Sequence, residues 1–485
     1  MRLDQVIPGT PSGAREVEVT TLAYDNRAVI PGTLFFCVPG MTRDGHEFAP
    51  DAVARGAVAL VVERPLNLSV PEIRVDDVRS AMAPAAARFN GDPSATLKVV
   101  GVTGTNGKTT TAFLVRELLE ADGRQCGLLG TVKSVIGGVE REVVRTTAEA
   151  IDLQRDLGAM LGGGDVACAI EVSSHALELH RADAVHFAAA IFTNLTQDHL
   201  DFHPSMEDYF AAKRRLFSEL APAVSVVNVD DRYGARLAAE LVAAGGEPVT
   251  FALEREASYR ALHVDTDLRG ARFTVRAPDR RIELATPLRG RFNVYNVLGA
   301  LAAVRALGVP METAAAAIEL AGQVPGRFET VDVGQPFAVV VDYAHTPDSL
   351  DNVLSSAREL VTAPGARLHV VFGAGGDRDR GKRPMMGRIA RRLADRVIVT
   401  SDNPRSEDPE AIITEILSGS GPHIEHNADR REAIELALST AAPGDVVVIA
   451  GKGHEQGQEF ADGLKLPFDD VTIARELLDV LSGQS

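Results

Sequence analysis

The 485-residue chain has no tryptophan, only three cysteines and few aromatic residues, which make up 5% of the sequence. Its cysteines, Cys37, Cys126 and Cys168, are odd in number and far apart, and most are flanked by apolar residues. A disulfide framework or a zinc site would need paired or clustered cysteines. We therefore expect three buried thiols that behave as small apolar side chains.

The chain also lacks an excess of basic residues and any long apolar run. Its 50 Lys and Arg face 67 Asp and Glu, giving a net charge of −17, whereas a nucleic-acid backbone attracts clustered positive charge. No apolar run reaches the roughly 18–20 residues of a membrane-spanning helix. The N-terminus, MRLDQVIPGT, lacks the basic-then-apolar form of a signal peptide. The sequence therefore predicts a cytoplasmic protein with no nucleic-acid partner and no membrane insertion.

The remaining composition, 45% apolar and 24% charged, is that of a globular chain. At about 100–200 residues per domain, this length predicts two to four domains. Residues 33–38 and 57–63 have the pattern of strands, and 77–89 that of a helix despite Pro84. The turn-rich stretch NGDPSAT at 90–96 then predicts a domain boundary. We expect an N-terminal domain over residues 1–96.

From Leu97 onward, apolar runs of five to seven residues alternate with helical segments. This alternation predicts an α/β fold with a parallel sheet covered on both faces. Residues 261–292 alternate more strictly, which favours a few antiparallel edge strands. The expected strands lie at 97–103, 165–172, 187–194 and 224–230, and the expected helices at 109–123, 206–220, 232–246 and 293–308.

A Gly/Pro hinge, GQVPGRFE at 322–329, precedes a second α/β series with strands expected at 337–343, 367–373, 395–401 and 444–451. Ligands of such sheets bind outside the carboxyl ends of the strands. The polar residues that follow these runs should therefore share one edge and form a cleft. They are Asp342, Asp377–Arg378, Asp402–Arg405 and Lys452–Glu455.

The stretch VVGVTGTNGKTTT at 99–111 is a Gly-rich loop between an expected strand and helix. Its backbone N–H groups can hold phosphates, Lys108 can reach the β/γ oxygens and the Thr109 hydroxyl can ligate Mg²⁺. The strict spacing G-x-x-x-x-G-K-T would need glycine at 102, where Val102 stands, and Gly104 follows. A tight turn without a ligand is the alternative, but the placement of the GKT triplet favours ATP binding.

Polar residues also follow two other expected strands. Glu171 ends the run ACAIEV, where a carboxylate can hold Mg²⁺ or cap the next helix. From sequence alone, Lys213 in YFAAKRRLF belongs to a basic helix face. The stretch NLTQDHLDFH at 194–203 favours a site over a structural role, because it gathers Asp198, His199, Asp201 and His203.

An ordered set of motifs resembles the Mur ligases along essentially the whole chain. The motifs are GTNGKTT, EVSSH, NLTQDHLDFH, AAKRRLF, RFNVYN, PGRFE, DYAHTPDSL, FGAGGDRDRGKRP, SDNPR and AGKGHE. Several are shared with folylpolyglutamate synthases, whereas the last four together are more specific. The resemblance implies three domains: an N-terminal α/β module for UDP-MurNAc at 1–96, a central P-loop ATPase with a parallel sheet at 97–325, and a Rossmann-like domain for an amino acid at 326–485.

The same resemblance implies ATP and Mg²⁺ as cofactors and five catalytic residues, namely Lys108, Glu171, His199, Lys213 and Arg327. Thr109 and Glu171 would hold one Mg²⁺ and His199 a second. Lys213 would be carbamylated, which turns an ammonium donor into an oxygen ligand. Arg327 would contact the γ-phosphate beside Lys108. The nucleotide would further contact Gly104, Thr105, Asn106, Gly107, Thr109 and Thr110, with Asn293 and Asn296 at the adenine, Asp342 at the ribose and His345 close by.

Two substrate sites are also implied. The UDP-MurNAc-dipeptide would contact Thr146, Thr147, Ser173 and Arg181; Leu179 stands where some relatives have glutamine and Asn26 where many have serine. The loop DNPR resembles the version that selects meso-diaminopimelate, whose distal end carries a carboxylate and an ammonium. Its SEDP continuation predicts a helix start with Asp408 as N-cap. The diaminopimelate contacts would be Arg378, Asp402, Asn403, Pro404, Arg405, Gly451 and Glu455.

The resemblance thus implies an ATP-dependent ligase that adds meso-diaminopimelate to the D-Glu carboxylate of UDP-MurNAc-L-Ala-D-Glu through an acyl phosphate. This is a step of peptidoglycan precursor synthesis, and so of cell-wall growth, cell shape and division. We expect the enzyme to be a monomer. Addition of L-lysine or ornithine remains an alternative. A folylpolyglutamate-type ligase would leave the N-terminal 95 residues and DNPR unexplained, and a P-loop switch or motor would leave the Asp/His cluster and Lys213 without a role.

Overall fold

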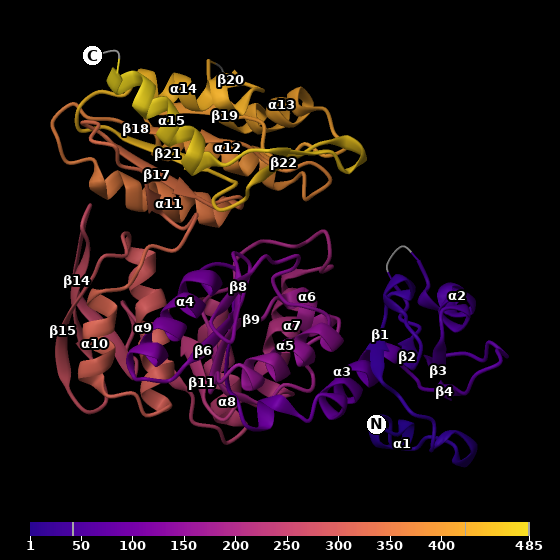
Figure 1. Ribbon diagram of the computed structural model, residues 1–485. Coiled ribbons are helices and arrows are strands. Elements are labelled where there is room, and N and C mark those ends of the chain that lie inside the picture. Colours follow the sequence, from indigo (N-terminus) through magenta and orange to yellow (C-terminus); the bar gives the residue numbers. More distant parts are fainter. Residues whose placement is uncertain (41–42, 422, 484–485) are drawn as a thin grey trace. The chain divides into compact units, whose positions relative to one another are not determined.

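The computed structural model describes residues 1–40, 43–421 and 423–483 (Figure 1). The chain divides into two compact units. Unit 1 consists of Met1–Thr103, Asp122–Ile191 and Ala211–Ser225, and unit 2 of Gly104–Ala121, Phe192–Phe210 and Val226–Ser485. No helix in the described ranges combines the length and the apolar character needed to cross a membrane. The domain limits expected after residues 96 and 325 remain predictions.

A four-stranded parallel sheet of order β1-β2-β3-β4 lies in the N-terminal part of unit 1. Leu34 and Phe36 pack in the hydrophobic cluster of α1 and α3, and Phe35 in that of α2, because successive strand residues face opposite sides. Asp77 caps α3, which runs through Pro84. The elements are β1 (Thr21–Ala23), β2 (Thr33–Phe36), β3 (Ala57–Val62), β4 (Glu72–Arg74), α1 (Leu3–Val6), α2 (Ala49–Ala54) and α3 (Val78–Phe89).

The rest of unit 1 is built on strands in the order β10-β5-β9-β6-β7-β8. The neighbours β5, β9 and β6 are parallel, which confirms the predicted parallel sheet, although β6 was not among the expected strands. Strands β7 and β8 form an antiparallel hairpin that was not predicted either. All three cysteines are buried, as expected. The elements are β5 (Lys98–Thr103), β6 (Cys126–Leu129), β7 (Ser134–Ile136), β8 (Val139–Arg141), β9 (Ala167–Glu171), β10 (Phe187–Phe192), α5 (Ala150–Gly162), α6 (Ser174–Glu178) and α7 (Met206–Ser218).

In unit 2, strands β11 to β15 follow one another in sequence order. The pairs from β11 to β13 are parallel, and β13-β14-β15 is antiparallel, which confirms the edge strands expected at 261–292. Helix α9, buried on most sides, packs against α4. The elements are α4 (Lys108–Ala121), β11 (Ser225–Asn228), α8 (Arg232–Ala243), β12 (Val249–Ala252), β13 (Tyr259–Asp267), β14 (Gly270–Arg276), β15 (Arg281–Thr286), α9 (Arg291–Ala306) and α10 (Met311–Glu319).

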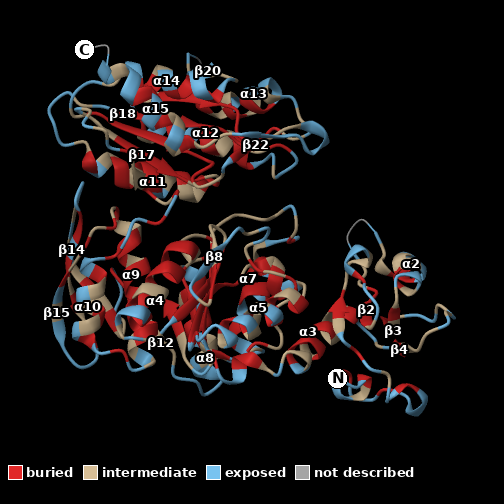
Figure 2. Cartoon of the chain, viewed as in Figure 1, coloured by how far each residue is buried: buried red, intermediate tan, exposed pale blue. Residues whose placement is uncertain are grey.

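The C-terminal sheet of unit 2 has the order β16-β17-β21-β18-β19-β20, and only the edge strand β16 runs antiparallel. Its buried strands lie between two helical layers, α11 to α13 on one face and α14 with α15 on the other (Figures 1 and 2). The strands are β16 (Glu329–Thr330), β17 (Ala338–Asp342), β18 (Leu368–Phe372), β19 (Arg396–Thr400), β20 (Glu425–Asn427) and β21 (Val446–Ala450). The helices are α11 (Pro347–Leu360), α12 (Lys382–Leu393), α13 (Pro409–Ser420), α14 (Arg430–Ser439) and α15 (Asp470–Gly483).

The four central strands of this sheet end at one edge, as predicted. Strands β17, β21, β18 and β19 are parallel neighbours, so the loops after them lie together. A hairpin of β22 (Gly457–Glu459) and β23 (Lys465–Pro467), which was not predicted, follows β21. Asp408 caps α13 by accepting from the N–H of Glu410, and Pro409 is its first residue, which confirms the predicted helix start.

Candidate active site

The loop between β5 and α4 has the backbone of a phosphate-binding loop. Gly104 and Gly107 have φ angles of +147° and +84°, which favour glycine. A Cβ at Gly104 would collide with Thr193, and one at Gly107 with Asn296. Lys108 is the first residue of α4, so the helix N-terminus opens onto the loop.

Residues that follow β10 form hydrogen bonds with this loop. The Thr105 N–H donates to the Asn194 carbonyl at 2.9 Å, and the Asn106 N–H donates to the Asn194 side chain at 2.9 Å. Thr193 Oγ1 donates to the Asn106 carbonyl at 2.6 Å. The loop shape is therefore set by hydrogen bonds that do not depend on a ligand.

Two cationic side chains lie at the loop. Lys108 Nζ donates to the carbonyls of Gly104 at 2.9 Å and Thr105 at 2.7 Å. Arg327 Nη2 donates to Thr109 Oγ1 at 3.1 Å, and its guanidinium lies 4.5 Å from the centre of the Tyr343 ring. Arg327 Nη1 is buried and has no hydrogen-bond partner among the described residues. A buried donor without a partner is costly, so this atom fits an anion such as a phosphate oxygen.

The residues expected around the nucleoside divide into two groups. Asn296 and Asn293 are buried on α9, and their amides are engaged with each other at 2.8 Å, with Thr111 at 3.3 Å and with the Arg289 carbonyl at 2.7 Å. This chain of bonds places Asn296 beside the loop at Gly107. Their contact with adenine remains a prediction.

Asp342 and His345 follow β17. Asp342 Oδ2 accepts from the Phe328 N–H at 2.7 Å, and burial raises the pKa of this carboxyl to about 6 although Arg327 opposes the shift. Burial also lowers the pKa of His345, whose Nδ1 donates to the Tyr343 carbonyl at 2.7 Å. Both side chains therefore favour their neutral forms more than exposed groups do.

His199 has a backbone φ of +54°, a conformation that is uncommon for a non-glycine residue and that concentrates at functional sites. Its N–H donates to Asp198 Oδ1 at 2.9 Å, and its Nε2 lies 3.4 Å from Asp198 Oδ2. Burial would raise the pKa of Asp198, but His199, His345 and Lys382 together hold it below its ordinary value. An ionised carboxylate beside a partly exposed imidazole results.

In unit 1, Glu171 ends β9 and is buried. Its Oε1 accepts from the Thr131 N–H at 2.7 Å, and its Oε2 from Thr131 Oγ1 at 3.1 Å. A Cβ at Gly130 would collide with Oε1, so the carboxylate lies directly against the backbone there. These bonds fix the orientation of Glu171, and the carboxylate does not cap the following helix, whose N-cap is Ser173.

The residues predicted to contact the UDP-linked substrate adjoin Glu171. Thr147 Oγ1 donates to the Glu171 carbonyl at 2.8 Å and accepts from the Ser173 N–H at 3.1 Å. Thr131 Oγ1 also bonds Thr146 Oγ1 at 3.1 Å. Arg181 Nη1 donates to the Thr147 carbonyl at 3.1 Å. One network thus brings the predicted substrate residues and the predicted metal ligand together.

Two predicted residues stand apart from this network. Leu179 is the C-cap of α6 and bonds through its backbone N–H to His175. Asn26 lies in a short 3-10 helix, Asn26–Ala28, and its Nδ2 donates to Asp51 Oδ2 at 2.8 Å. These are the positions where the sequence departs from the family pattern, and their substrate contacts remain predictions.

Lys213 does not belong to an exposed basic helix face. Its side chain is buried, with the residue only 1% exposed, and Nζ lies 3.5 Å from Thr103 Oγ1, at the end of β5. The interpretation of Lys213 as part of an exposed basic helix face is therefore wrong, and its carbamylation, implied by the resemblance, remains a prediction.

The predicted Mg²⁺ ligands have suitable chemistry only in part. Mg²⁺ prefers oxygen, which Glu171 and the Thr109 hydroxyl offer. An unmodified lysine has no acceptor, so Lys213 fits only as a carbamate. Within the described ranges, no three His, Cys, Asp or Glu side chains converge as a metal site. The role of Thr109, Glu171, His199 and Lys213 as metal ligands therefore remains a prediction.

A second group of predicted residues surrounds the carboxyl edge of the C-terminal sheet. Asn403 Nδ2 donates to Glu455 Oε2 at 2.8 Å, which joins the loop after β19 to the loop after β21. Gly451 has a φ of +122°, and a Cβ there would collide with Asp402 Oδ2. Pro404 offers its carbonyl to the Glu407 N–H, and its carbonyl lies against Gly376. The DNPR loop is therefore closely packed against both neighbouring loops.

The two arginines predicted in this pocket differ in exposure. Arg405, with a φ of +52°, donates through Nε to Glu459 Oε2 at 2.9 Å and through Nη1 to the Gly376 carbonyl at 2.8 Å. Arg378 is exposed, and its Nη1 donates to the Asp377 carbonyl at 3.1 Å. Arg405 is thus held in place, whereas Arg378 extends into solvent.

Residues outside the predicted set support this pocket. Glu459, on the unpredicted β22, pairs with Arg405, and Lys452 donates to both Asn403 and Glu455. Arg430 of α14 and Asp470 of α15 form a fully buried two-pronged ion pair at 2.8 and 2.7 Å. Arg430 also donates to the carbonyls of Ser401 at 3.3 Å and Ala450 at 3.0 Å, the residues that precede the two pocket loops. Only Lys452 lay in a predicted loop, and there it had no assigned role.

Three family models match successive parts of the chain. They are described as "Mur ligase family, catalytic domain" for residues 18–99, "Mur ligase middle domain" for 102–304 and "Mur ligase, glutamate ligase domain" for 326–453.

Curated relatives match nearly the full length. Proteins named UDP-N-acetylmuramoyl-L-alanyl-D-glutamate–2,6-diaminopimelate ligase from Solibacter usitatus and Halalkalibacterium halodurans are 45% and 44% identical, over 96% and 95% of this chain and 94% of each relative. A solved structure with the same enzyme name is 33% identical, with a TM-score of 0.72 and 99% of each chain covered.

Proposed function

Because the chain belongs to the Mur ligase family, we propose that it is an ATP-dependent ligase of the MurE type, which joins meso-diaminopimelate to the D-Glu carboxylate of UDP-MurNAc-L-Ala-D-Glu. The names of its full-length relatives support this reaction. The observation that carries the substrate assignment is the pocket of Asn403, Arg405 and Glu455 at one sheet edge. It offers a guanidinium for a carboxylate and a carboxylate for an ammonium.

The reaction needs activation of the acid. A carboxylate and an amine do not condense spontaneously in water, so transfer of the γ-phosphoryl group to the D-Glu carboxylate first forms an acyl phosphate. The amine nitrogen then attacks the carbonyl carbon, the C–O bond to phosphate breaks, and the nitrogen loses a proton as the amide forms. ADP and inorganic phosphate are the other products.

The first step brings an anionic carboxylate against an anionic triphosphate. Positive charge must therefore be placed where the two meet. Lys108 sits over the loop, and Arg327 holds an unpaired buried N–H beside Thr109. We assign both residues to the γ-phosphoryl group, because both are cations at the phosphate loop and a phosphate oxygen would supply the acceptor that Arg327 Nη1 lacks.

Mg²⁺ would add charge neutralisation of the phosphates and alignment of the reacting oxygens. Thr109, Glu171, His199 and carbamylated Lys213 are its proposed ligands. The hydrogen bonds of Glu171 to Thr131 hold the carboxylate in one orientation. The network through Thr147, Ser173 and Arg181 supports a substrate site beside it, where Arg181 would bind an anionic group of the UDP-linked peptide.

The second step needs a positioned, unprotonated amine. In the proposed pocket, Arg405 and Arg378 bind carboxylates of diaminopimelate, and Glu455 and Asp402 accept hydrogen bonds from its ammonium. Guanidinium–carboxylate pairing is charge-assisted and directional, so it can distinguish diaminopimelate from lysine, which lacks the distal carboxylate. We place the reaction in the cytoplasm, in a monomer, as a step of peptidoglycan precursor synthesis.

Phosphate release tests this proposal. The enzyme is incubated with ATP, Mg²⁺ and UDP-MurNAc-L-Ala-D-Glu, and with meso-diaminopimelate, L-lysine or ornithine in parallel. The fastest release is expected with diaminopimelate, and mass spectrometry should show the corresponding UDP-tripeptide. Preference for lysine would refute the amino-acid assignment alone. ATP turnover that does not depend on any of the amino acids would refute the assignment as a ligase.

A folylpolyglutamate-type ligase is the weaker alternative. It shares the ATPase core, but it gives no role to the N-terminal part matched at residues 18–99 or to the DNPR loop. Addition of glutamate to a folate by this enzyme would support this alternative.

A further inference from the structure

The amino-acid pocket contains a buried lysine whose role follows from the bonds it makes. Lys452 lies in the loop after β21 and is fully buried. Its Nζ donates to Asn403 Oδ1 at 2.9 Å and to Glu455 Oε2 at 3.0 Å, and lies 3.8 Å from Asp402 Oδ1. One ammonium therefore faces three side chains of the proposed diaminopimelate site.

These bonds determine the orientation of the Asn403 amide. A lysine ammonium and a backbone N–H can only donate, whereas a carboxylate can only accept. Lys452 Nζ and the Glu459 N–H, at 3.0 Å, both face Oδ1 of Asn403. Glu455 Oε2 faces its Nδ2 at 2.8 Å. If the amide were flipped, its NH₂ group would face the two donors, Lys452 Nζ and the Glu459 N–H, and its oxygen would face Glu455 Oε2. None of these three hydrogen bonds could then form.

The two oxygens of the Glu455 carboxylate differ in their hydrogen bonds. Oε2 accepts from both Lys452 and Asn403, which leaves Oε1 as the atom outside this network. Burial would raise the pKa of Glu455, but Lys452 and Asn403 hold it below its ordinary value. His345 also lowers the pKa of Glu455, and the charges of Glu455 and Asp402 act in turn on Tyr343 and Arg430. Oε1 of Glu455 is thus the carboxylate oxygen that can accept a hydrogen bond from the amino acid.

We propose that Lys452 is a positioning residue for amino-acid selection: it fixes the Asn403 amide as a donor and Glu455 Oε1 as the acceptor that the incoming amino acid meets. The proposal rests on the proposed function and deepens it. Lys452 touches the ligand's partners and not the reacting atoms. Its loss should therefore weaken binding of the amino acid without affecting ATP or the UDP-linked peptide.

Arg430, a second buried cation on which Asp402 and Glu455 act, is not free to replace Lys452, because it is already paired with Asp470 and with two backbone carbonyls. A Cβ at Gly451 would collide with Asp402 Oδ2, so a side chain at position 451 could not supply a charge there. Removing the ammonium would leave Asp402 and Glu455 close together with their neutralising charge gone.

The test compares Lys452→Met with Lys98→Met, which replaces an exposed lysine at the start of β5. For Lys452→Met, the KM for diaminopimelate should rise about ten- to hundred-fold, the range for a hydrogen bond to a charged group, while the KM values for ATP and the UDP-dipeptide stay within about threefold. Lys98→Met should leave all three unchanged. Thermal unfolding of each variant checks the fold, and Lys452→Gln, which keeps a donor without the charge, replaces a methionine variant that does not fold.

A double-mutant cycle separates positioning from general destabilisation. If Lys452 acts through Asn403, Lys452→Met should cost much less in an Asn403→Ala background than in the wild type. Full additivity, an unchanged KM for the amino acid, or an equal rise for all three substrates would each overturn the proposal. Wild-type preference for lysine would refute only the diaminopimelate assignment, and the cycle would then be run with lysine.

Discussion

Arg405 is the residue on which the identity of the amino acid depends. It is held by Glu459 and the Gly376 carbonyl, so its guanidinium is placed before a ligand arrives. Arg405→Ala should raise the KM for diaminopimelate by about ten- to hundred-fold, because a hydrogen bond to a charged group contributes about 1.5–3 kcal/mol. Steady-state kinetics measures this, with the exposed Arg391→Ala as control. An unchanged KM would remove Arg405 from the site.

Lys213 gives a second test at the same scale. A carbamate forms reversibly from an amine and carbon dioxide, so enzyme prepared without carbon dioxide should lose activity and regain it with bicarbonate. Lys213→Ala should be inactive under both conditions. Intact-protein mass spectrometry under non-acidic conditions should show the added carboxyl group. Full activity without carbon dioxide, with an unmodified mass, would contradict the carbamate.

Asp342 should make stability depend on pH. Its folded pKa is raised to about 6, above the 3.8 of an exposed aspartate, so the folded chain binds the extra proton between these values. Stability from this group is therefore present at low pH and is lost as the pH rises towards about 6, by up to about 3 kcal/mol. Asp342→Asn should remove this loss. Urea unfolding from pH 4.5 to 7 measures the difference, and parallel curves for both proteins would contradict it.

The sequence could predict which residues lie at the sites far better than it could predict the partners that position those residues. Asp402, Asn403, Arg405 and Glu455 follow apolar runs, so parallel strands bring them to one edge. Glu459 lies on a short, polar strand far along the chain, and nothing in its local pattern marks it as the partner of Arg405. Such long-range pairings arise from packing and not from local pattern.

Among the elements, the phosphate loop offers the sharpest test. Gly107→Ala would introduce both an unfavourable φ and a collision with Asn296, so ATP affinity should fall at least about ten-fold. Gly123, with a φ of +76°, has open space around it. Gly123→Ala should therefore cost about 1 kcal/mol of stability and leave ATP affinity unchanged. Calorimetric titration with ATP measures both, and equal affinities for the two variants would contradict the steric argument.

The elements found from sequence share one property: each has a continuous apolar run or a helical period. The core strands of both α/β series and the helices α3, α4 and α9 are of this kind. The hairpins β7–β8 and β22–β23 are short and largely exposed at the second strand, so no apolar period marks them. Edge hairpins are stabilised by their neighbours, which a local pattern does not contain.

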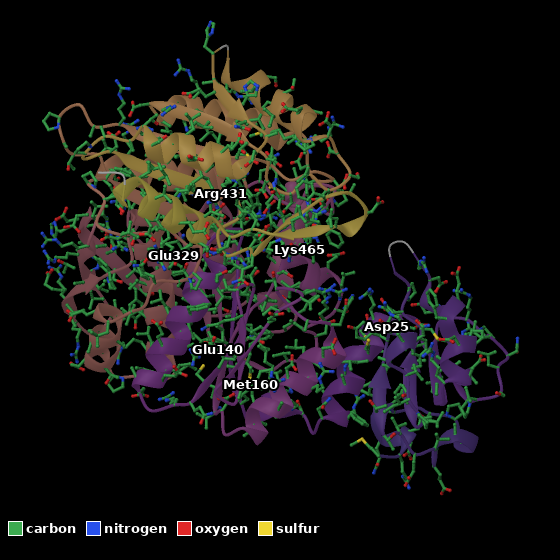
Figure 3. All side chains as sticks on the ribbon, turned by 45° about the horizontal axis from the view of Figure 1, so that its top comes forward. Asp25, Glu140, Met160, Glu329, Arg431 and Lys465 are labelled. Carbon is green, nitrogen blue, oxygen red and sulfur yellow. The ribbon has the colours of Figure 1, made fainter. Side chains whose placement is uncertain are left out.

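At the scale of the whole molecule, the chain between α10 and β16 is where we expect movement. It contains neither helix nor strand at Gly322–Val324, whereas Gly326 packs against Gly453 and His454, and its N–H donates to Glu329, marked in Figure 3. We therefore place the expected hinge before Gly326. We expect that closure around this segment excludes water from the acyl phosphate.

Small-angle scattering can test this closure. The radius of gyration should fall when a non-hydrolysable ATP analogue and the UDP-dipeptide are added together. The same ligands should leave a Lys108→Ala variant unchanged, because it lacks the cation for the triphosphate. An unchanged radius in the wild type would contradict closure.

The buried pair of Arg430 and Asp470 has a consequence for the gene as well as for the fold. Asp470 opens the final helix, α15, so a nonsense codon placed after the β22–β23 hairpin would spare every residue of the amino-acid pocket and still delete the partner of Arg430. A guanidinium left buried without its carboxylate costs about 3–5 kcal/mol, a large share of the 5–15 kcal/mol by which proteins are stable. Premature termination that late should therefore act as a loss-of-function allele.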